Sequence, residues 1–162
     1  MFENESKVYA FMLGYIENVV DDLTDDVMDK PPAPGVNPPV WILGHLAIAP
    51  DWGLQSMGKP ALCPELWHKQ FGPGSDPAKI ARPHPTKAEL LAAIRRGHEA
   101  FTAAARQADP AAMSEPHSIP FLQDSPIKTV GETVTLLMTA HDSVHIGQLS
   151  LCRRLRGKPH LF

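Results

Sequence analysis

Hydrophobic residues recur every three or four positions along four stretches of the chain, a spacing that predicts amphipathic helices. The predicted helices cover residues 4–28, 38–57, 86–105 and 129–156. Proline is costly inside a helix, and most of the 17 prolines lie between these stretches. Since no stretch shows the sustained alternation typical of strands, we predict an all-α four-helix bundle that forms a single domain over residues 1–162. The connections at residues 59–85 and 109–128 are long enough to suggest a functional role, such as covering one end of the bundle.

Capping signals set several helix boundaries. Residues 86–89 (Thr-Lys-Ala-Glu) and 129–132 (Thr-Val-Gly-Glu) have the form of a capping box, and Asn37 before Pro38 predicts the start of the second helix. Pro50 lies inside that helix and is expected to kink it or to end it early. The predicted apolar face of the first helix consists of Val8, Phe11, Met12, Tyr15, Ile16, Val19 and Leu23. The aspartates near its end have the wrong sign for the helix dipole, so we expect them to form a solvated face.

The composition is that of an ordinary globular protein, with 43% hydrophobic and 20% charged residues. A formal net charge of −3 gives no basic surface for phosphate groups, so we expect no nucleic-acid partner. No apolar run is long enough to span a membrane, and the first residues do not have the pattern of a signal peptide. Cys63 and Cys152 are too few for a disulfide scaffold and are typical of a reducing compartment. We therefore expect a cytoplasmic protein without membrane association.

Two histidines in the fourth helix, His141 and His145, lie where apolar residues are expected. Their spacing of four residues places both side chains on one face of the helix, one turn apart. The predicted inner face consists of Val134, Leu137, Met138, His141, His145, Gln148, Leu149 and Cys152. Burying two unpaired imidazoles would cost about 1–3 kcal/mol each, so they require hydrogen-bond partners or a shared cation.

A third histidine, His45, lies on an apolar face of the second helix, between Trp41 and Trp52. One histidine from the second helix and two from the fourth can form a three-nitrogen site that leaves coordination positions open. Open positions are typical of catalytic metal sites, whereas structural zinc sites are closed. Three imidazoles suit Zn²⁺ or Ni²⁺ best, with Fe²⁺, Mn²⁺ and Cu²⁺ as alternatives.

Two motifs carry a family resemblance. Residues 38–47 (PPVWILGHLA) and 140–149 (AHDSVHIGQL), in this order and at this separation, resemble the second-helix and fourth-helix signatures of the DinB/YfiT-like superfamily. The resemblance covers essentially the whole chain. It implies a four-helix bundle, often a homodimer, with a divalent metal bound by His45, His141 and His145. Members with known activity are thiol-dependent S-transferases, maleylpyruvate-type isomerases or metal-dependent hydrolases, which implies a small-molecule substrate and, for transfer, a low-molecular-weight thiol.

Three further residues are weighed as parts of this site. His98 lies on the predicted inner face of the third helix, where it can be a satisfied core or rim histidine, a fourth ligand, or a residue that contacts a ligand from behind. Gln148 follows His145 by about one turn, so it can hydrogen-bond an imidazole or simply pack between helices. Asp142 is displaced by about 100° from its neighbour His141, which excludes it as a ligand and leaves an outer role open.

The catalytic acid and base stay unassigned. Glu132 lies about two turns before His141, and Asp51 points away from the face that carries His45. Transfer and hydrolysis are therefore both open, and a non-enzymatic metal or small-ligand binding module is the alternative to an enzyme. A purely structural dimerising bundle would leave the three inward histidines unexplained.

Overall fold

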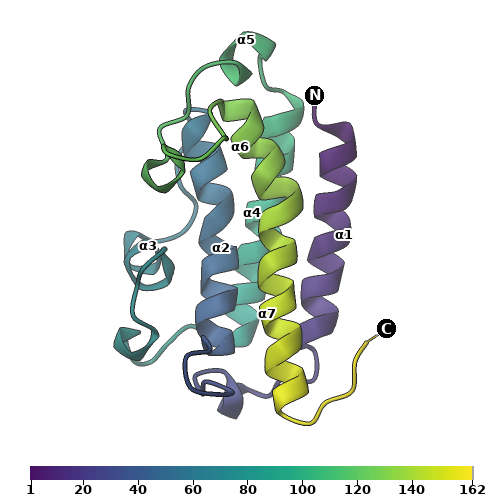
Figure 1. Cartoon of the computed structure of the whole chain (residues 1–162), viewed down its shortest axis with the longest axis vertical. Helices are drawn as coiled ribbons and strands as arrows, with labels where there is room; N and C mark the ends of the chain where they lie inside the picture. Colours follow the sequence, from purple (N-terminus) through teal and green to yellow (C-terminus); the bar gives the residue numbers. More distant parts are fainter. Residues whose placement is uncertain (162) are drawn as a thin grey trace.

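Four long helical segments lie side by side in the computed structural model, which describes residues 1–161 (Figure 1). They are α1 (Glu3–Val20), α2 (Pro39–Ser56), α4 (Lys87–Arg106) and a fourth segment made of α6 (Val130–Leu136), the π-helical turn η4 (Leu137–His141) and α7 (Asp142–Leu155). The shorter elements are α3 (Glu65–Phe71), α5 (Pro110–Met113) and the 3₁₀ turns η1 (Asp25–Val27), η2 (Pro77–Lys79) and η3 (Pro120–Leu122). Residues 1–161 contain no strand, only an isolated bridge between Pro116 and Thr129. The prediction of an all-α four-helix bundle is confirmed.

The first helix is shorter than predicted and buries a different face. It ends at Val20, and Thr24 is extended (φ −78°, ψ 155°), so the predicted helical region 4–28 is wrong beyond residue 20. Aspartate and threonine have low helix propensity because their side chains compete for backbone hydrogen bonds, and the four aspartates and Thr24 that follow Val20 account for the early end. Val8 and Phe11, predicted to face the core, are 38% and 64% exposed, while Tyr9 is buried.

One of the aspartates after α1 is not simply solvated, as had been expected for the group. Asp22 accepts hydrogen bonds from Nε and Nη2 of Arg153 at 2.9 and 2.7 Å, and the Arg153 side chain is buried. The hydrogen bonds from Arg153 lower the pKa of Asp22, although partial burial opposes this. The pair links the end of α1 to α7 and gives the buried guanidinium its counter-charge.

The second helix lies at the centre of the bundle and contacts α4, α3 and α7. Pro50 does not end it early, because the helix continues to Ser56. The proline ring packs against Gly97 of α4, where an added Cβ would lie 2.8 Å from Pro50 Cγ. Although α2 is apolar, none of the helices in residues 1–161 is long and apolar enough to cross a membrane.

The fourth helix begins as predicted but is not a continuous α-helix. Both capping boxes are present, with Thr86 and Glu89 at α4 and Thr129 and Glu132 at α6. The π-helical turn η4 ends at His141 and inserts an extra residue into the helix, which offsets the helix face by about 100°. Such single turns are frequent at functional sites.

The long connections contain short helices that pack on the bundle. The first, residues 59–85, includes α3, which lies alongside α2. Buried Asp51 of α2 holds this connection, because its carboxylate accepts hydrogen bonds from the backbone of Leu62 and Cys63 (2.8 and 3.0 Å) and from His68 Nε2 (2.9 Å). The second connection carries α5 and η3 and lies at the end of the bundle near the N-terminus (Figure 1). The expectation that a long connection covers one end therefore holds for this segment.

A glycine in α2 permits the close approach of α3. A Cβ at Gly44 would lie 2.3 Å from Cγ of Phe71, so Gly44→Ala must displace the phenylalanine ring and with it α3. We expect Gly44→Ala to lower the free energy of unfolding by about 1–3 kcal/mol, measured by urea denaturation. The matched control is Gly147→Ala in α7, which meets no other atom of its own chain within 4 Å and, in a monomeric chain, should be neutral or stabilising by up to about 1 kcal/mol. Equal effects of the two substitutions would contradict the packing argument.

Candidate metal centre

Three imidazoles from two helical segments meet inside the bundle. His45 comes from α2, His141 from the π-helical turn and His145 from α7. One nitrogen of each lies within 4.8 Å of the others, and Nε2 of His45 is 3.2 Å from Nε2 of His141. The ring of His145 is centred 4.5 Å from that of His45 and 4.6 Å from that of His141. The structure therefore brings together the three histidines that the sequence singled out.

Hydrogen bonds hold the outer nitrogens of two of these rings. His45 Nδ1 donates to the backbone carbonyl of Phe71 at 2.7 Å, and His145 Nδ1 donates to Oε1 of Gln148 at 3.0 Å. Because a carbonyl oxygen only accepts, both Nδ1 atoms carry the proton and both Nε2 atoms keep a lone pair. Of the two alternatives for Gln148, the structure shows the hydrogen bond to an imidazole. The Phe71 carbonyl belongs to the last turn of α3, where helix carbonyls lack helical partners.

The third ring, His141, faces a buried carboxylate. Asp142 Oδ1 lies 3.6 Å from His141 Nδ1, and Asp142 Oδ2 lies 3.1 Å from Nε2 of His98 in α4. Burial raises the pKa of Asp142, but its contacts with His141 and His98 outweigh burial and bring the pKa below its usual value. Asp142 therefore lies behind His141 as an anion, in agreement with its exclusion as a ligand. His98 is buried and contacts Asp142, so it lies behind the three-histidine cluster and is not part of it.

Aromatic side chains form walls around the three histidines. Trp41 stacks on His45 with centroids 4.9 Å apart, and its Nε1 donates to Ser75 Oγ at 2.8 Å. Trp52 contacts His45 at 5.3 Å between ring centroids and His141 at 6.1 Å. Phe121, from the second long connection, packs against Trp52 with centroids 5.4 Å apart. The periodicity of the helices gave no signal for Phe121, because it lies in a 3₁₀ turn far from both motifs.

The electrostatics of the cluster favour neutral imidazoles. Burial, followed by the charge of His145, lowers the pKa of His45 to about 3. Burial, followed by the charge of His141, lowers the pKa of His145 to about 4. Both rings are therefore uncharged at neutral pH, and the neutral imidazole is the form that binds a metal.

The arrangement fits a divalent transition metal. With Nδ1 of His141 directed at a carboxylate, the Nε2 lone pairs of His45 and His141 face each other at 3.2 Å, which is repulsive unless a cation or proton lies between them. Two nitrogens bound to one tetrahedral zinc ion lie about 3.3 Å apart, close to this separation. An all-imidazole donor set suits zinc, nickel, copper or iron, whereas harder ions prefer oxygen ligands.

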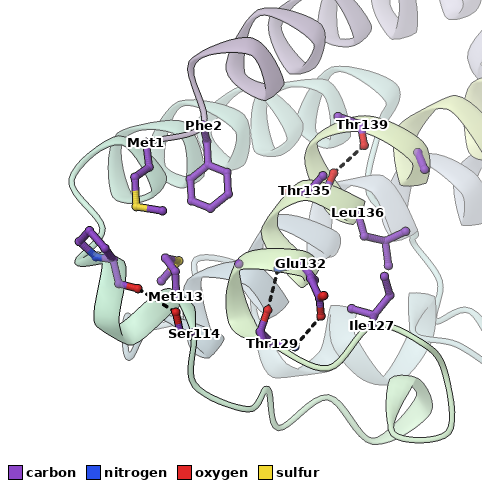
Figure 2. Close-up of a pocket in the computed structure, with 13 residues that line it drawn as sticks. Met1, Phe2, Met113, Ser114, Ile127, Thr129, Glu132, Thr135, Leu136 and Thr139 are labelled. Atoms are coloured by element: carbon purple, nitrogen blue, oxygen red, sulfur yellow. Dashed lines mark hydrogen bonds between the residues drawn. The ribbon is translucent and has the colours of Figure 1, made fainter.

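A separate pocket of about 540 Å³ opens where α1 begins, beside α5 and α6 (Figure 2). Met1 and Phe2 face Met113 and the capping box of Thr129 and Glu132 across it (Figure 2). The thirteen residues that line this pocket include none of the three histidines. It is therefore distinct from the candidate metal centre.

Comparison with known families agrees with the position of the histidines. The family model of the DinB superfamily matches residues 11–149, a range that includes all three histidines and the helices that carry them. The chain belongs to the DinB superfamily. The match confirms the resemblance carried by the two motifs. A search of curated protein sequences found no significant match to this DinB superfamily chain.

Solved structures share the fold of this DinB superfamily protein. YfiT from Bacillus subtilis, described as a probable metal-dependent hydrolase with an unusual four-helix bundle topology, is 20% identical with a TM-score of 0.68, and the match covers 97% of this chain and 88% of YfiT. A conserved protein from Enterococcus faecalis is 17% identical with a TM-score of 0.65, and the match covers 98% of each chain. At these identities the comparisons establish the bundle topology.

The lowered histidine pKa values make the stability of the metal-free protein depend on pH. Since the folded pKa values of His45 and His145 (about 3 and about 4) lie below the ordinary value of 6.5, the unfolded chain binds more protons between pH 6.5 and 4. We expect the free energy of unfolding to fall as the pH decreases through this window, measured by urea denaturation with a chelator present. The His45→Gln/His145→Gln variant should show a shallower dependence, and an unchanged slope would contradict the pKa assignment.

Proposed function

We propose that this DinB superfamily protein is a metal-dependent enzyme that binds a divalent transition metal through His45, His141 and His145. One observation carries the proposal: one ring nitrogen of each of the three histidines lies within 4.8 Å of the other two, and the Nδ1 atom of each ring lies near an oxygen atom outside the cluster. Metal-binding histidines are typically held in this way, because the outer contact fixes the tautomer and the ring orientation. Zinc and nickel are the ions that we expect first.

A cation held by three imidazoles would supply Lewis acidity, which lowers the pKa of an adjacent thiol or water toward neutral. The side chains around the three histidines would shape the site and hold its ligands in place. Trp41, Trp52 and Phe121 exclude water from one side of the cluster and offer apolar surface to a substrate. Asp142 faces the back of His141, so it holds that ring and does not reach a substrate at the front.

The reaction class that we propose is transfer of a low-molecular-weight thiol to an electrophilic small molecule, or the related thiol-dependent isomerisation. In transfer, the thiol loses its proton to solvent and its sulfur forms a bond to the electrophilic carbon. The carbon–oxygen bond of an epoxide or the carbon–halogen bond of a halide breaks at the same time. The alkoxide takes a proton from solvent, or the halide ion leaves. This chemistry suits the site because a thiolate attacks without a general base once it has formed.

Hydrolysis is the second candidate, and a specific observation favours it. The structural neighbour YfiT is described as a probable metal-dependent hydrolase. Hydrolysis would use the same three histidines, with water as the nucleophile in place of a thiol. A substrate screen should therefore include ester and amide substrates beside thiol acceptors.

The test combines metal content with turnover. We expect about one divalent transition metal per chain in protein purified without chelators, and thiol conjugation to an epoxide or halide that requires this metal. His141→Ala/His145→Ala should lose both the metal and the activity, measured by elemental analysis and by thiol consumption. His160→Ala, near the C-terminus, is the matched control and should keep both.

The possible outcomes separate the candidates. Wild-type protein that stays metal-free after reconstitution would contradict the enzyme proposal. Bound metal with ester hydrolysis and no thiol transfer would favour the hydrolase. Bound metal without turnover across the screen would favour a non-enzymatic binding module.

We also propose that two copies of the chain associate through α1 and α7. These helices contact each other and both carry exposed apolar side chains, Phe11 on α1 and Val144, Leu151 and Leu155 on α7. Exposed apolar surface of this kind is typical of protein interfaces.

The dimer proposal predicts a change in mass. We expect light scattering coupled to gel filtration to give twice the chain mass for the wild type and the monomer mass for Phe11→Glu/Val144→Glu. Leu66→Glu, an equally exposed apolar residue on α3, should leave the dimer intact. A monomeric wild type would contradict the proposal.

A further inference from the structure

Behind the candidate ligand His141, buried polar side chains extend from Asp142 to His98 and Tyr9, and the proposed function uses only Asp142. Asp142 is 1% exposed and His98 is 3% exposed, and Asp142 lies between His98 and His141. Tyr9 of α1 stacks on His98 with centroids 3.6 Å apart and an interplanar angle of 8°. Residues from α1, α4 and α7 thus meet behind His141. This is the ring of the three that has no hydrogen bond to a backbone carbonyl or a side-chain amide.

These groups are costly to bury. A carboxylate in a protein core is unfavourable unless opposite charge and hydrogen bonds surround it. The carboxylate of Asp142 lies 3.1 Å from His98 Nε2 and 3.6 Å from His141 Nδ1, yet both nitrogens of His98 and Nδ1 of His141 lack well-aligned hydrogen bonds. Apolar side chains at these positions would stabilise the bundle better than buried polar ones. We therefore attribute to Asp142 and His98 a role in holding the ring of His141.

We propose that Asp142 and His98 are positioning residues that fix the orientation and the tautomer of His141 for metal binding, an inference that rests on the proposed function. The carboxylate of Asp142 attracts a proton to Nδ1 of His141, which leaves the Nε2 lone pair directed at His45. His98 holds Asp142 from the other side, and the stacked ring of Tyr9 holds His98.

The carboxylate also balances charge. Three imidazoles carry no negative charge to balance a divalent cation, and the buried carboxyl group of Asp142 lies 3.6 Å from Nδ1 of one of them. Loss of this charge should weaken metal binding even if the ring of His141 keeps its place. Removal of such outer partners typically lowers metal affinity by about 10- to 100-fold.

The experiment measures Co²⁺ affinity by visible absorbance in competition with a chelator. We expect Asp142→Asn to weaken Co²⁺ binding by about 10- to 100-fold and His98→Gln to weaken it less. Asp22→Asn is the matched control, because it removes the carboxylate that pairs with buried Arg153 at a distance from the histidines. This control should lower stability and leave the Co²⁺ affinity unchanged.

A second measurement does not depend on metal. Long-range ¹H–¹⁵N spectra of the metal-free protein report the histidine tautomers, and we expect His141 to carry its proton on Nδ1 in the wild type. Asp142→Asn should shift His141 toward a mixture of tautomers, while Asp22→Asn should not.

The outcomes distinguish this inference from the proposed function. Wild-type protein that binds no Co²⁺ would contradict both. Wild-type affinity in Asp142→Asn, or a wild-type His141 protonated on Nε2, would overturn the positioning role and leave the three-histidine site in place.

Discussion

The candidate metal centre depends on the contacts that hold the three imidazoles from behind. Their Nε2 atoms can face one another only if each ring is fixed against the repulsion between lone pairs. A different group does this for each ring: the Phe71 carbonyl for His45, Gln148 for His145, and the carboxylate of Asp142 for His141. The geometry of the cluster is therefore set by residues outside the three-histidine cluster itself.

This requirement explains why α3 packs so closely on α2. The carbonyl that holds His45 is a free helix C-terminal carbonyl, so α3 must be placed accurately beside α2. The absence of a side chain at Gly44 leaves room for the ring of Phe71. Asp51 accepts hydrogen bonds from the backbone of the segment that leads into α3. The long connection at residues 59–85 thus contributes to the site through its backbone and through its packing.

Local patterns in the sequence predict much of this fold and the identity of the central residues. Helical periodicity and the two capping boxes are local properties, so the four long helices and the histidines on their inner faces could be expected. The early end of α1 was missed because a buried Leu23 continues the apolar pattern after the helix has stopped. The π-helical turn has no signature in the spacing of apolar residues.

Other parts of the site depend on long-range contacts that no sequence pattern reveals. The acceptor for His45 is a backbone carbonyl 26 residues away, and any residue at position 71 would provide one. His98 meets Asp142 only because α4 and α7 face each other across the core, so its role could not be separated from that of an ordinary core histidine. Phe121 reaches Trp52 from a 3₁₀ turn, outside any helical periodicity.

The most direct test of the three-histidine site is the X-ray absorption spectrum of the zinc-loaded protein at the metal edge. We expect three imidazole nitrogens at about 2.0–2.1 Å, with the outer-shell scattering typical of histidine rings. A first shell that contains sulfur at about 2.3 Å, or only oxygen atoms without imidazole scattering, would contradict the assignment of His45, His141 and His145 as the ligands.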